Sequence, residues 1–263
     1  TMRPMSAYRE LWAHRDLLIL LVGRNLKLRY KQTSLGFFWS LLGPLFQIVI
    51  YKIFLGILKV EVTIESLVTG IFMWQFLATT VGDSLTVIVG HATLIKKTPF
   101  PRIVLPLSTA LANFVNFALS VVVLVVFLSF FDPKPHAIWL IPILLASHFA
   151  LCLGMGLLVS SCNVFFRDIE HLVSAGMMAW FFMSPAIYDI ETFVTRQLGE
   201  GVVPLYLLNP MASLLASYRM VFLGMNETLS PVFLIPGFAL CWIIFLTGLK
   251  VFHRLDGRFS DVL

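Results

Sequence analysis

Two charged side chains in this chain lie well away from the ends of long apolar runs, and they are the groups most able to do chemistry. They are Lys52 and Asp83. A charge inside a bilayer is costly and often marks an ion or substrate path. At 1.5 Å per residue, Lys52 lies about 25 Å from the inner end of its run and Asp83 about 10 Å from that of the next run, so no direct ion pair is expected. Lys52 either snorkels to the outer interface or faces a pore. Asp83 either faces a wet cavity or has a structural partner near the inner interface.

No arrangement of residues supports catalysis. The sequence has no Ser-His-Asp, paired-carboxylate or metal-ligand pattern, and His148 stands alone as an expected core residue. The three cysteines, Cys152, Cys162 and Cys241, are far apart and are expected to be small core residues. No lysine follows a glycine, so a phosphate-binding Gly-x-x-x-x-Gly-Lys-[Ser/Thr] loop is absent. The chain is therefore predicted not to be an enzyme and to hold no metal or cofactor. If ATP powers it, another chain must bind the nucleotide.

Six apolar runs must position these side chains. Each has about the 20 residues that a helix needs to cross a bilayer, and 59% of the chain is hydrophobic. The runs are Leu35–Leu58, Leu67–Val89, Ile103–Phe131, Ala137–Cys162, Leu172–Ile190 and Val232–Phe252. They predict an all-α polytopic membrane protein with one membrane domain over 1–263. Five spans lie in 35–190 and the sixth in 232–252, and a cytoplasmic tail follows in 253–263.

Basic residues are distributed unevenly around these runs. If the N-terminus is inside, fourteen lysines and arginines fall in inner segments and four in outer segments, with Lys52 inside a span. By the positive-inside rule, both termini are then cytoplasmic. The basic clusters flank the runs and contain few aromatic residues, so they predict membrane anchoring and not nucleic-acid binding.

Residues 8–31 precede the first run and predict an amphipathic helix in the cytoplasmic headgroup layer. Its apolar and basic faces are made by Leu18, Val22, Leu26 and Tyr30 and by Arg24, Lys27 and Lys31, respectively. Arg29 falls within the apolar arc and is expected to snorkel. The alternative interpretation is an ordinary basic anchor for the first span.

Residues 191–230 are partly apolar but are not predicted to cross the membrane. Asn209-Pro210 and Arg219 interrupt the stretch Pro204–Leu223, and a seventh crossing would place the basic tail outside. We expect a pair of short outer helices that enter the membrane only where protein or water covers their backbone ends.

Two short inner loops are suited to docking a partner. The first, His91–Arg102, is basic, and its Leu94 and Ile95 are predicted to be an exposed apolar pair on a small cytoplasmic helix. Such an exposed pair is typical of a docking surface. The second loop, Asn163–Ile169, is equally compact.

Aromatic residues make up 14% of the chain, and several of them lie in the runs or near their ends. They form either an interfacial belt or a pore lining, since sugars stack their apolar faces on rings. The candidates for a pore or gate are Trp39, Trp74, Trp180, Phe181 and Tyr188, together with Asn209. The amides of Gln47, Gln75, Asn113 and Asn116 are expected to form interhelical hydrogen bonds.

An ordered series of motifs resembles one family. The series includes Arg29-Tyr30, Ser34-Leu35-Gly36, Leu94-Ile-Lys-Lys97, Phe100-Pro-Arg102, Asn163-Val-Phe-Phe-Arg-Asp168, Ser184-Pro185, Asn209-Pro210 and Gly257–Leu263. Nearly end to end, the chain is similar to permease subunits of ABC exporters for polysaccharides, of the O-antigen and teichoic acid type (Wzm- and TagG-like). Capsule permeases are the nearest alternative, and they tend to lack the Phe-Phe-Arg-Asp run.

The resemblance implies partners. A homodimer of this chain would form a pore in the bacterial inner membrane, with two ABC ATPase subunits beneath it that hold ATP and Mg²⁺. The substrate would be an undecaprenyl-diphosphate-linked glycan that moves outward from the cytoplasmic side. The rival classes are a secondary transporter that uses Lys52 or Asp83 as a charge relay, and a membrane-embedded glycosyl- or acyltransferase.

The resemblance also implies roles for three regions. Residues 8–31 would be an interface helix at the substrate entrance, 93–102 a coupling helix for the ATPase, and 191–224 outer gate helices. The cations of the first region would bind a diphosphate headgroup or, alternatively, attract anionic phospholipid. The implied site residues are Arg24, Lys27, Arg29 and Lys31 at the entrance, Leu94, Ile95, Lys96, Lys97, Phe100 and Arg102 in the coupling helix, and Phe166, Arg167 and Asp168 in the second inner loop.

Overall fold

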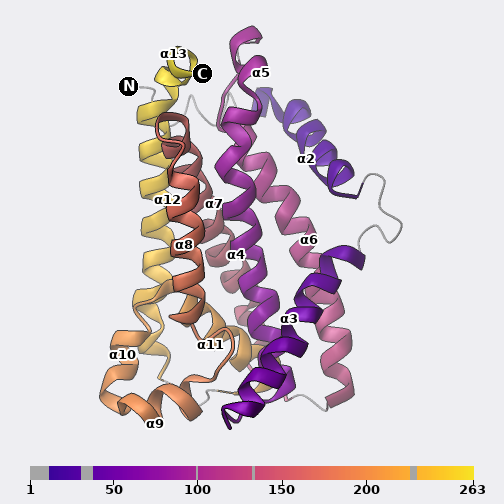
Figure 1. Cartoon of the computed structure of the whole chain (residues 1–263), viewed down its shortest axis with the longest axis vertical. Coiled ribbons are helices and arrows are strands. Elements are labelled where there is room, and N and C mark those ends of the chain that lie inside the picture. Colours follow the sequence, from indigo (N-terminus) through magenta and orange to yellow (C-terminus); the bar gives the residue numbers. More distant parts are fainter. Residues whose placement is uncertain (1–11, 31–37, 99, 132–133, 226–229) are drawn as a thin grey trace.

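The computed structural model describes residues 12–30, 38–98, 100–131, 134–225 and 230–263, and these residues form helices and no strand (Figure 1). The helices are α2 (Arg15–Tyr30), α3 (Phe38–Ile57), α4 (Ile64–Gly90), α5 (Ala92–Lys97), α6 (Val104–Leu128), α7 (Ile141–Phe165), α8 (Ile169–Phe182), α9 (Thr195–Leu198), α10 (Val203–Tyr206), α11 (Pro210–Leu223), α12 (Ile235–Leu255) and α13 (Phe259–Val262). Short turns of 3₁₀ or π helix flank several of them, at Ser129–Phe131, Ile138–Leu140, Ile190–Val194, Glu200–Val202, Pro231–Phe233 and Asp256–Arg258.

Four helical stretches in the described part of the chain are long and apolar enough to cross a membrane. They are Ile64–Gly90, Val104–Phe131, Ile138–Phe165 and Ile235–Arg258, and shorter apolar helices cover Leu41–Ile57 and Pro210–Leu223. The prediction of an all-helical, multi-pass membrane protein is therefore confirmed. The start of the first predicted span, residues 35–37, lies outside the described residues.

The predicted fifth span, Leu172–Ile190, is wrong as a single helix. Helix α8 has 14 residues and ends at Phe182, immediately before Met183-Ser184-Pro185. Proline has no backbone N–H, and it disfavours the helical conformation of the residue before it. Residues 183–189 therefore leave the helix, and they form part of the buried outer network described below.

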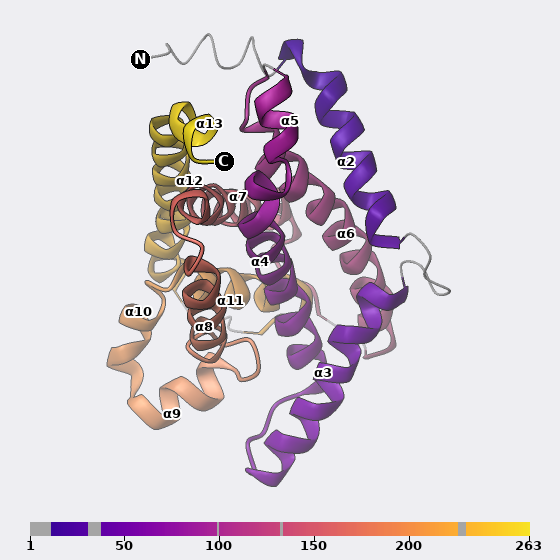
Figure 2. The ribbon, with the colours of Figure 1, turned by 45° about the horizontal axis from the view of Figure 1, so that its top comes forward.

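Helix α4 lies at the centre of the fold and contacts α3, α6, α7 and α11. Of its apolar window, 72% is buried, compared with 22% for the windows of α6 and α12. The apolar side chains of α6 and α12 thus largely face outward, as expected for helices in contact with lipid. Helix α3 crosses at an angle beside α4 (Figures 1 and 2).

The two ends of the molecule separate the predicted inner and outer segments. Helices α5 and α13 lie at one end, with the start of α2, and α9 and α10 lie at the opposite end (Figure 1). The predicted pair of outer helices is more elaborate than expected. Helices α9 and α10 are single turns, whereas α11 has 14 residues, of which Met211–Phe222 are all buried. Protein covers α11 on all sides, which meets the condition set for an outer helix that enters the membrane.

Two glycines let α7 and α12 approach backbone to backbone. A Cβ added at Gly248 would lie 2.3 Å from the carbonyl oxygen of Gly154, and one added at Gly154 would lie 2.5 Å from Cα of Phe245. Small residues commonly allow membrane helices to approach in this way. The contact sets the distance between the two helices.

Replacing Gly248 by valine should therefore separate α7 from α12 and lower the free energy of unfolding by about 1–3 kcal/mol or more. Thermal unfolding of the detergent-solubilised protein measures the loss. The matched control is Gly82→Ala on α4, where a Cβ meets open space, so the melting temperature should be unchanged or slightly higher. Equal melting temperatures for Gly248→Val and the natural protein would contradict this role.

Candidate functional site

A polar cluster joins α2, α4 and α6 on the inner half of the molecule. Arg29 forms an ion pair with Asp83, and the Asn113 amide nitrogen donates to the same carboxylate oxygen at 3.0 Å. The expectation that Arg29 snorkels is wrong. It shares a helix face with Leu18 and Leu21, which pack on the inner core, and this face turns the guanidinium toward Asp83.

Asp83 combines the two roles that the sequence left open, because it has a partner and also borders a cavity. A cavity of about 410 Å³ lies between α2, α4 and α6, lined by Asp83, Arg29 and Asn113 among others. A second cavity of about 340 Å³ shares Arg29 and Asn113 and continues past Gln75 to Trp39. The cluster thus lies where the two cavities meet.

Replacing Asp83 by alanine should loosen α2 without unfolding the protein. The carboxylate is 45% exposed, and pairs of this kind contribute about 0.2–1 kcal/mol. The detached state of α2 should then be populated up to about fivefold more often. Maleimide labelling of a cysteine placed at the half-buried Asn25 measures this change. Asp16→Ala is the control, since Asp16 is exposed and, among the described residues, pairs with its neighbour Arg15 at 3.8 Å; equal labelling in both variants would contradict the anchoring role.

Two of the other predicted entrance residues, Arg24 and Lys27, do not join this cluster. Arg24 and Lys27 are exposed on α2, and Lys31 lies outside the described residues. The side chains of Arg24 and Lys27 are thus accessible, whereas Arg29 is paired with Asp83.

The first inner loop forms helix α5, and one prediction about it is wrong. Ile95 is 6% exposed and belongs to the inner hydrophobic core, so Leu94 and Ile95 are not an exposed pair. Adjacent residues of a helix point about 100° apart, so they cannot both face outward on a helix that lies on a core. Leu94 is half-buried, whereas Lys96 and Lys97 are exposed.

The remaining predicted loop residues separate into two groups. Phe100 packs on the inner core, and Arg102 contacts the chain end, as described below. Phe166, Arg167 and Asp168 of the second inner loop are all exposed.

An aromatic cluster brings together most of the predicted gate residues. The Trp74 ring lies 6.0 Å from Trp180 and 5.3 Å from Phe181, in edge-to-face contacts. The Trp180 indole donates to the Asn209 side-chain oxygen at 2.8 Å, and Asn209 also caps α11 by accepting from the Met211 amide at 3.1 Å. Asn209 therefore links the end of α8 to the start of α11. Trp39 lies apart from this cluster, beside the 340 Å³ cavity.

Tyr188 lies next to this cluster on the outer side. Its hydroxyl donates to the carbonyl of Phe182 at 2.8 Å and lies 2.9 Å from the hydroxyl of Tyr206 on α10. Burial raises the pKa of Tyr206, and the hydrogen bond to Tyr188 raises that pKa further. Both hydroxyls therefore stay protonated and hold α10 to the chain after α8.

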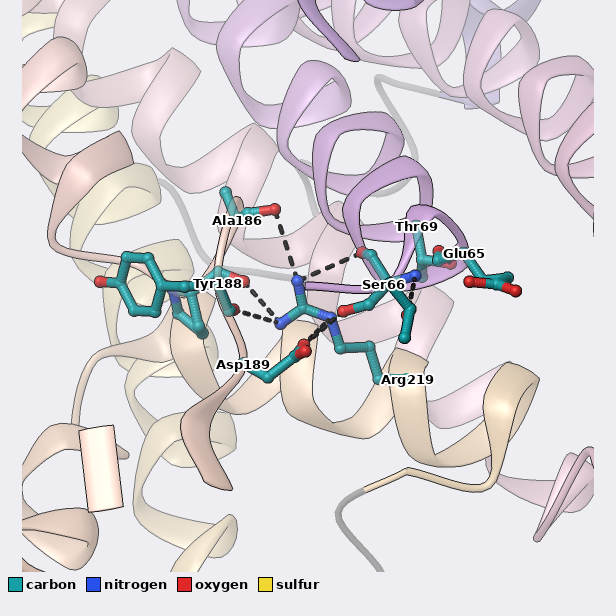
Figure 3. Close-up of polar contacts among 9 residues, drawn as sticks. Glu65, Ser66, Thr69, Ala186, Tyr188, Asp189 and Arg219 are labelled. Carbon is teal, nitrogen blue, oxygen red and sulfur yellow. Dashed lines mark hydrogen bonds and ion pairs between the residues drawn. The ribbon is translucent and has the colours of Figure 1, made fainter. Parts of the chain in front are cut away.

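A buried arginine dominates the outer half of the molecule. From the sequence, Arg219 was expected to be an outer cation that interrupts an apolar stretch, and no partner was predicted for it. Arg219 on α11 is fully buried, and its Nε lies 3.4 Å from a carboxylate oxygen of Asp189 (Figure 3). Its other nitrogens donate to the carbonyls of Pro185 at 2.6 Å, Tyr188 at 3.1 Å, Ser66 at 3.2 Å and Ala186 at 3.4 Å. The Ser66 hydroxyl donates to Asp189 as well.

This network ties α4, α11 and residues 185–189 together around one guanidinium. Arginine suits the role because its five N–H groups spread in a plane and stay protonated. The available signal was an arginine inside a helix-length apolar stretch that follows a lone aspartate, Asp189.

The isolated polar residues have structural partners. Lys52 donates to the Val62 carbonyl at 2.6 Å near the start of α4, which favours the outer-interface role. His148 is fully buried with Nδ1 3.3 Å from the Tyr218 hydroxyl, as predicted for a core residue. Among the described residues, no group of three or more His, Cys, Asp or Glu side chains is placed to hold a metal.

The comparisons with known proteins agree on one family. A family model described as ABC-2 type transporter matches residues 16–223. Two O-antigen export system permease proteins RfbA from Klebsiella pneumoniae are 33% and 34% identical, each over 94% of this chain and 95% of the relative. An O-antigen export system permease protein RfbA from Myxococcus xanthus is 33% identical over 81% of this chain and 83% of the relative. Together with the multi-pass helical fold, these matches show that the chain belongs to the ABC-2 type transporter family as a membrane permease.

Proposed function

We propose that this permease exports a lipid-linked polysaccharide of the O-antigen class, moving it outward from the cytoplasmic side. The observation that carries the proposal is the nearly full-length similarity to O-antigen export permeases. The sequence lacks a phosphate-binding loop, so the energy of ATP must enter through another chain. A teichoic acid or capsule glycan is the alternative substrate, but the three relatives described above are all named as O-antigen export permeases.

The assembly that fits this function has two copies of the chain and two ATPase subunits, which carry ATP and Mg²⁺. The exposed part of α5 and the exposed residues 166–168 are the surfaces proposed for docking the ATPase. The exposed cations Arg24 and Lys27 are proposed to attract the diphosphate of an undecaprenyl-linked substrate, because phosphate favours charge-assisted hydrogen bonds. The aromatic cluster around Trp74 is proposed to support the outer gate.

Deleting the gene tests the substrate. We expect the polymer to disappear from the cell surface and its lipid-linked form to accumulate inside, and we expect the natural gene to restore export. Co-purification with an ABC ATPase and ATP-dependent export in proteoliposomes should accompany this result. Normal surface polymer after deletion, or transport by this chain alone driven by a proton gradient, would contradict the proposal.

The proposed topology places the chain in a bacterial inner membrane with both termini cytoplasmic. After the native cysteines are removed, a cysteine at Arg196 on α9 should react with an impermeant maleimide from outside. Cysteines at Lys97 or Arg258, which are exposed at the opposite end, should react only after permeabilisation. Labelling of position 258 from outside would mean that the number of crossings is odd.

A further inference from the structure

The last residues of the chain pack under the first inner loop. Phe259 on α13 is fully buried, with its ring 5.5 Å from Phe252 of α12 and 6.1 Å from Phe165 at the end of α7. All of them belong to or pack on the core that contains Ile95 of α5. Helix α13, which carries Phe259, thus lies beside α5 and the end of α7 (Figure 2), and its phenylalanine packs on the core that these elements share with α12.

A second connection is polar and independent of that core. Arg102, which follows α5, donates a hydrogen bond from one guanidinium nitrogen to the backbone carbonyl of Asp256. Its other terminal nitrogen donates a hydrogen bond to the hydroxyl of Ser260. The two partners of Arg102 follow it in the sequence by 154 and 158 positions, so the contacts are long-range. A guanidinium with two oxygen partners is held in both position and orientation.

Helix α5 needs such support because it has only 6 residues. A helix this short is unstable alone and takes its position from tertiary contacts. Ile95 supplies one contact through the core, and Arg102 supplies the other through residues 256–260. The orientation of the exposed face of α5, with Lys96 and Lys97, therefore depends on the segment 256–263.

We propose that residues 256–263 are a positioning element of the ATPase interface, which fix α5 for docking and pass its displacement to α12 and α7. The proposal rests on the proposed docking of an ATPase on α5. Phe259 provides the mechanical contact, because close-packed buried side chains transmit displacement with little loss. Arg102 keeps the loop and the segment moving as one unit.

The test uses the complete permease–ATPase complex in proteoliposomes. Arg102→Gln removes the charge that holds Asp256 and Ser260, and Phe259→Ala empties the contact between the helices. Each should lower either the ATPase retained on purification or the export per ATP hydrolysed by about tenfold or more. Amide hydrogen exchange of residues 92–97 should rise, while exchange in the middle of α7 stays unchanged. Phe259→Leu should restore most of the function, and Val126→Ala, at a residue of α6 that is 57% exposed and lies outside the segment 256–263, should behave like the natural chain.

The ratio of export to ATP hydrolysis in assembled complexes separates positioning from general damage, which would lower the yield but not the ratio. If Phe259→Ala fails to insert into the membrane, the ratio of export to ATP hydrolysis is compared in the Arg102→Gln and Phe259→Leu variants instead. Natural retention and coupling in Arg102→Gln and Phe259→Ala, with loss of the ATPase in a Lys96→Glu/Lys97→Glu variant, would overturn the positioning role and leave docking on α5 intact. Natural behaviour in the lysine variant too would overturn docking itself.

Discussion

Replacing Asp189 by alanine should lower the free energy of unfolding of the permease by about 3–5 kcal/mol, because it leaves a buried arginine without its counter-ion. The Asp189 and Arg219 side chains are 3% and 1% exposed, so water cannot replace the carboxylate. The four backbone carbonyls around Arg219 remain, but they offer only partial charges. Residues 185–189 should detach first, and with them the contacts of the proposed outer gate. Thermal unfolding in detergent and protease sensitivity of this segment measure the two effects.

Two further variants isolate the ion pair from its surroundings. Arg219→Met with Asp189→Leu should cost less than the two single changes added together, since the double change leaves no unpaired charge. Arg196→Met, at an exposed arginine on α9, should leave stability unchanged. A loss below about 1 kcal/mol for Asp189→Ala would indicate an ordinary exposed pair and contradict the role assigned here.

Gly70 offers an independent test of the same network. A Cβ at Gly70 would lie 2.1 Å from the Ala186 carbonyl oxygen and 2.8 Å from an Arg219 nitrogen. Gly70→Ala should therefore push residues 185–189 outward without removing any charge. It should reproduce the protease sensitivity of Asp189→Ala, although α4 gains a better helix former.

Aspartate at position 94 and aspartate at position 95 should have different effects. Leu94→Asp should weaken binding of the ATPase about 5- to 150-fold, because a leucine buried at an interface contributes about 1–3 kcal/mol. Ile95→Asp should instead lower the yield of folded permease, since Ile95 lies in the inner core at 6% exposure and its new charge would have no partner.

Quantitative co-purification with the ATPase and the melting temperature of the isolated permease distinguish these two outcomes. Each variant is the control for the other, because both add the same charge to the same helix. Equal melting temperatures with equal loss of the ATPase would mean that both residues face the partner. That result would reinstate the exposed apolar pair expected from the sequence.

The apolar runs were predicted well where a helix is long and uninterrupted. The runs Leu67–Val89 and Ile103–Phe131 correspond to α4 and α6 within a few residues. The run Leu172–Ile190 failed because hydropathy does not register the effect of Ser184-Pro185 on the backbone. Burial is likewise hidden from hydropathy. Helix α11 is less apolar than α6 yet is far more completely covered by protein.

Membrane insertion, helical class and the uneven charge of the two ends follow from the residues alone, because transfer into lipid is nearly a sum over residues along one helix. The partners of the charged groups do not follow from such a sum over single residues. Arg29 meets Asp83 because α2 and α4 lie at a particular angle and rotation, and Arg219 on α11 meets Asp189 because the non-helical residues 185–189 pack beside α11. In the same way, the rotation of α5 about its axis turns Ile95 inward and leaves Lys96 exposed. Such rotations depend on packing among several helices at once, as at Gly154 and Gly248, and no single segment of sequence contains that information.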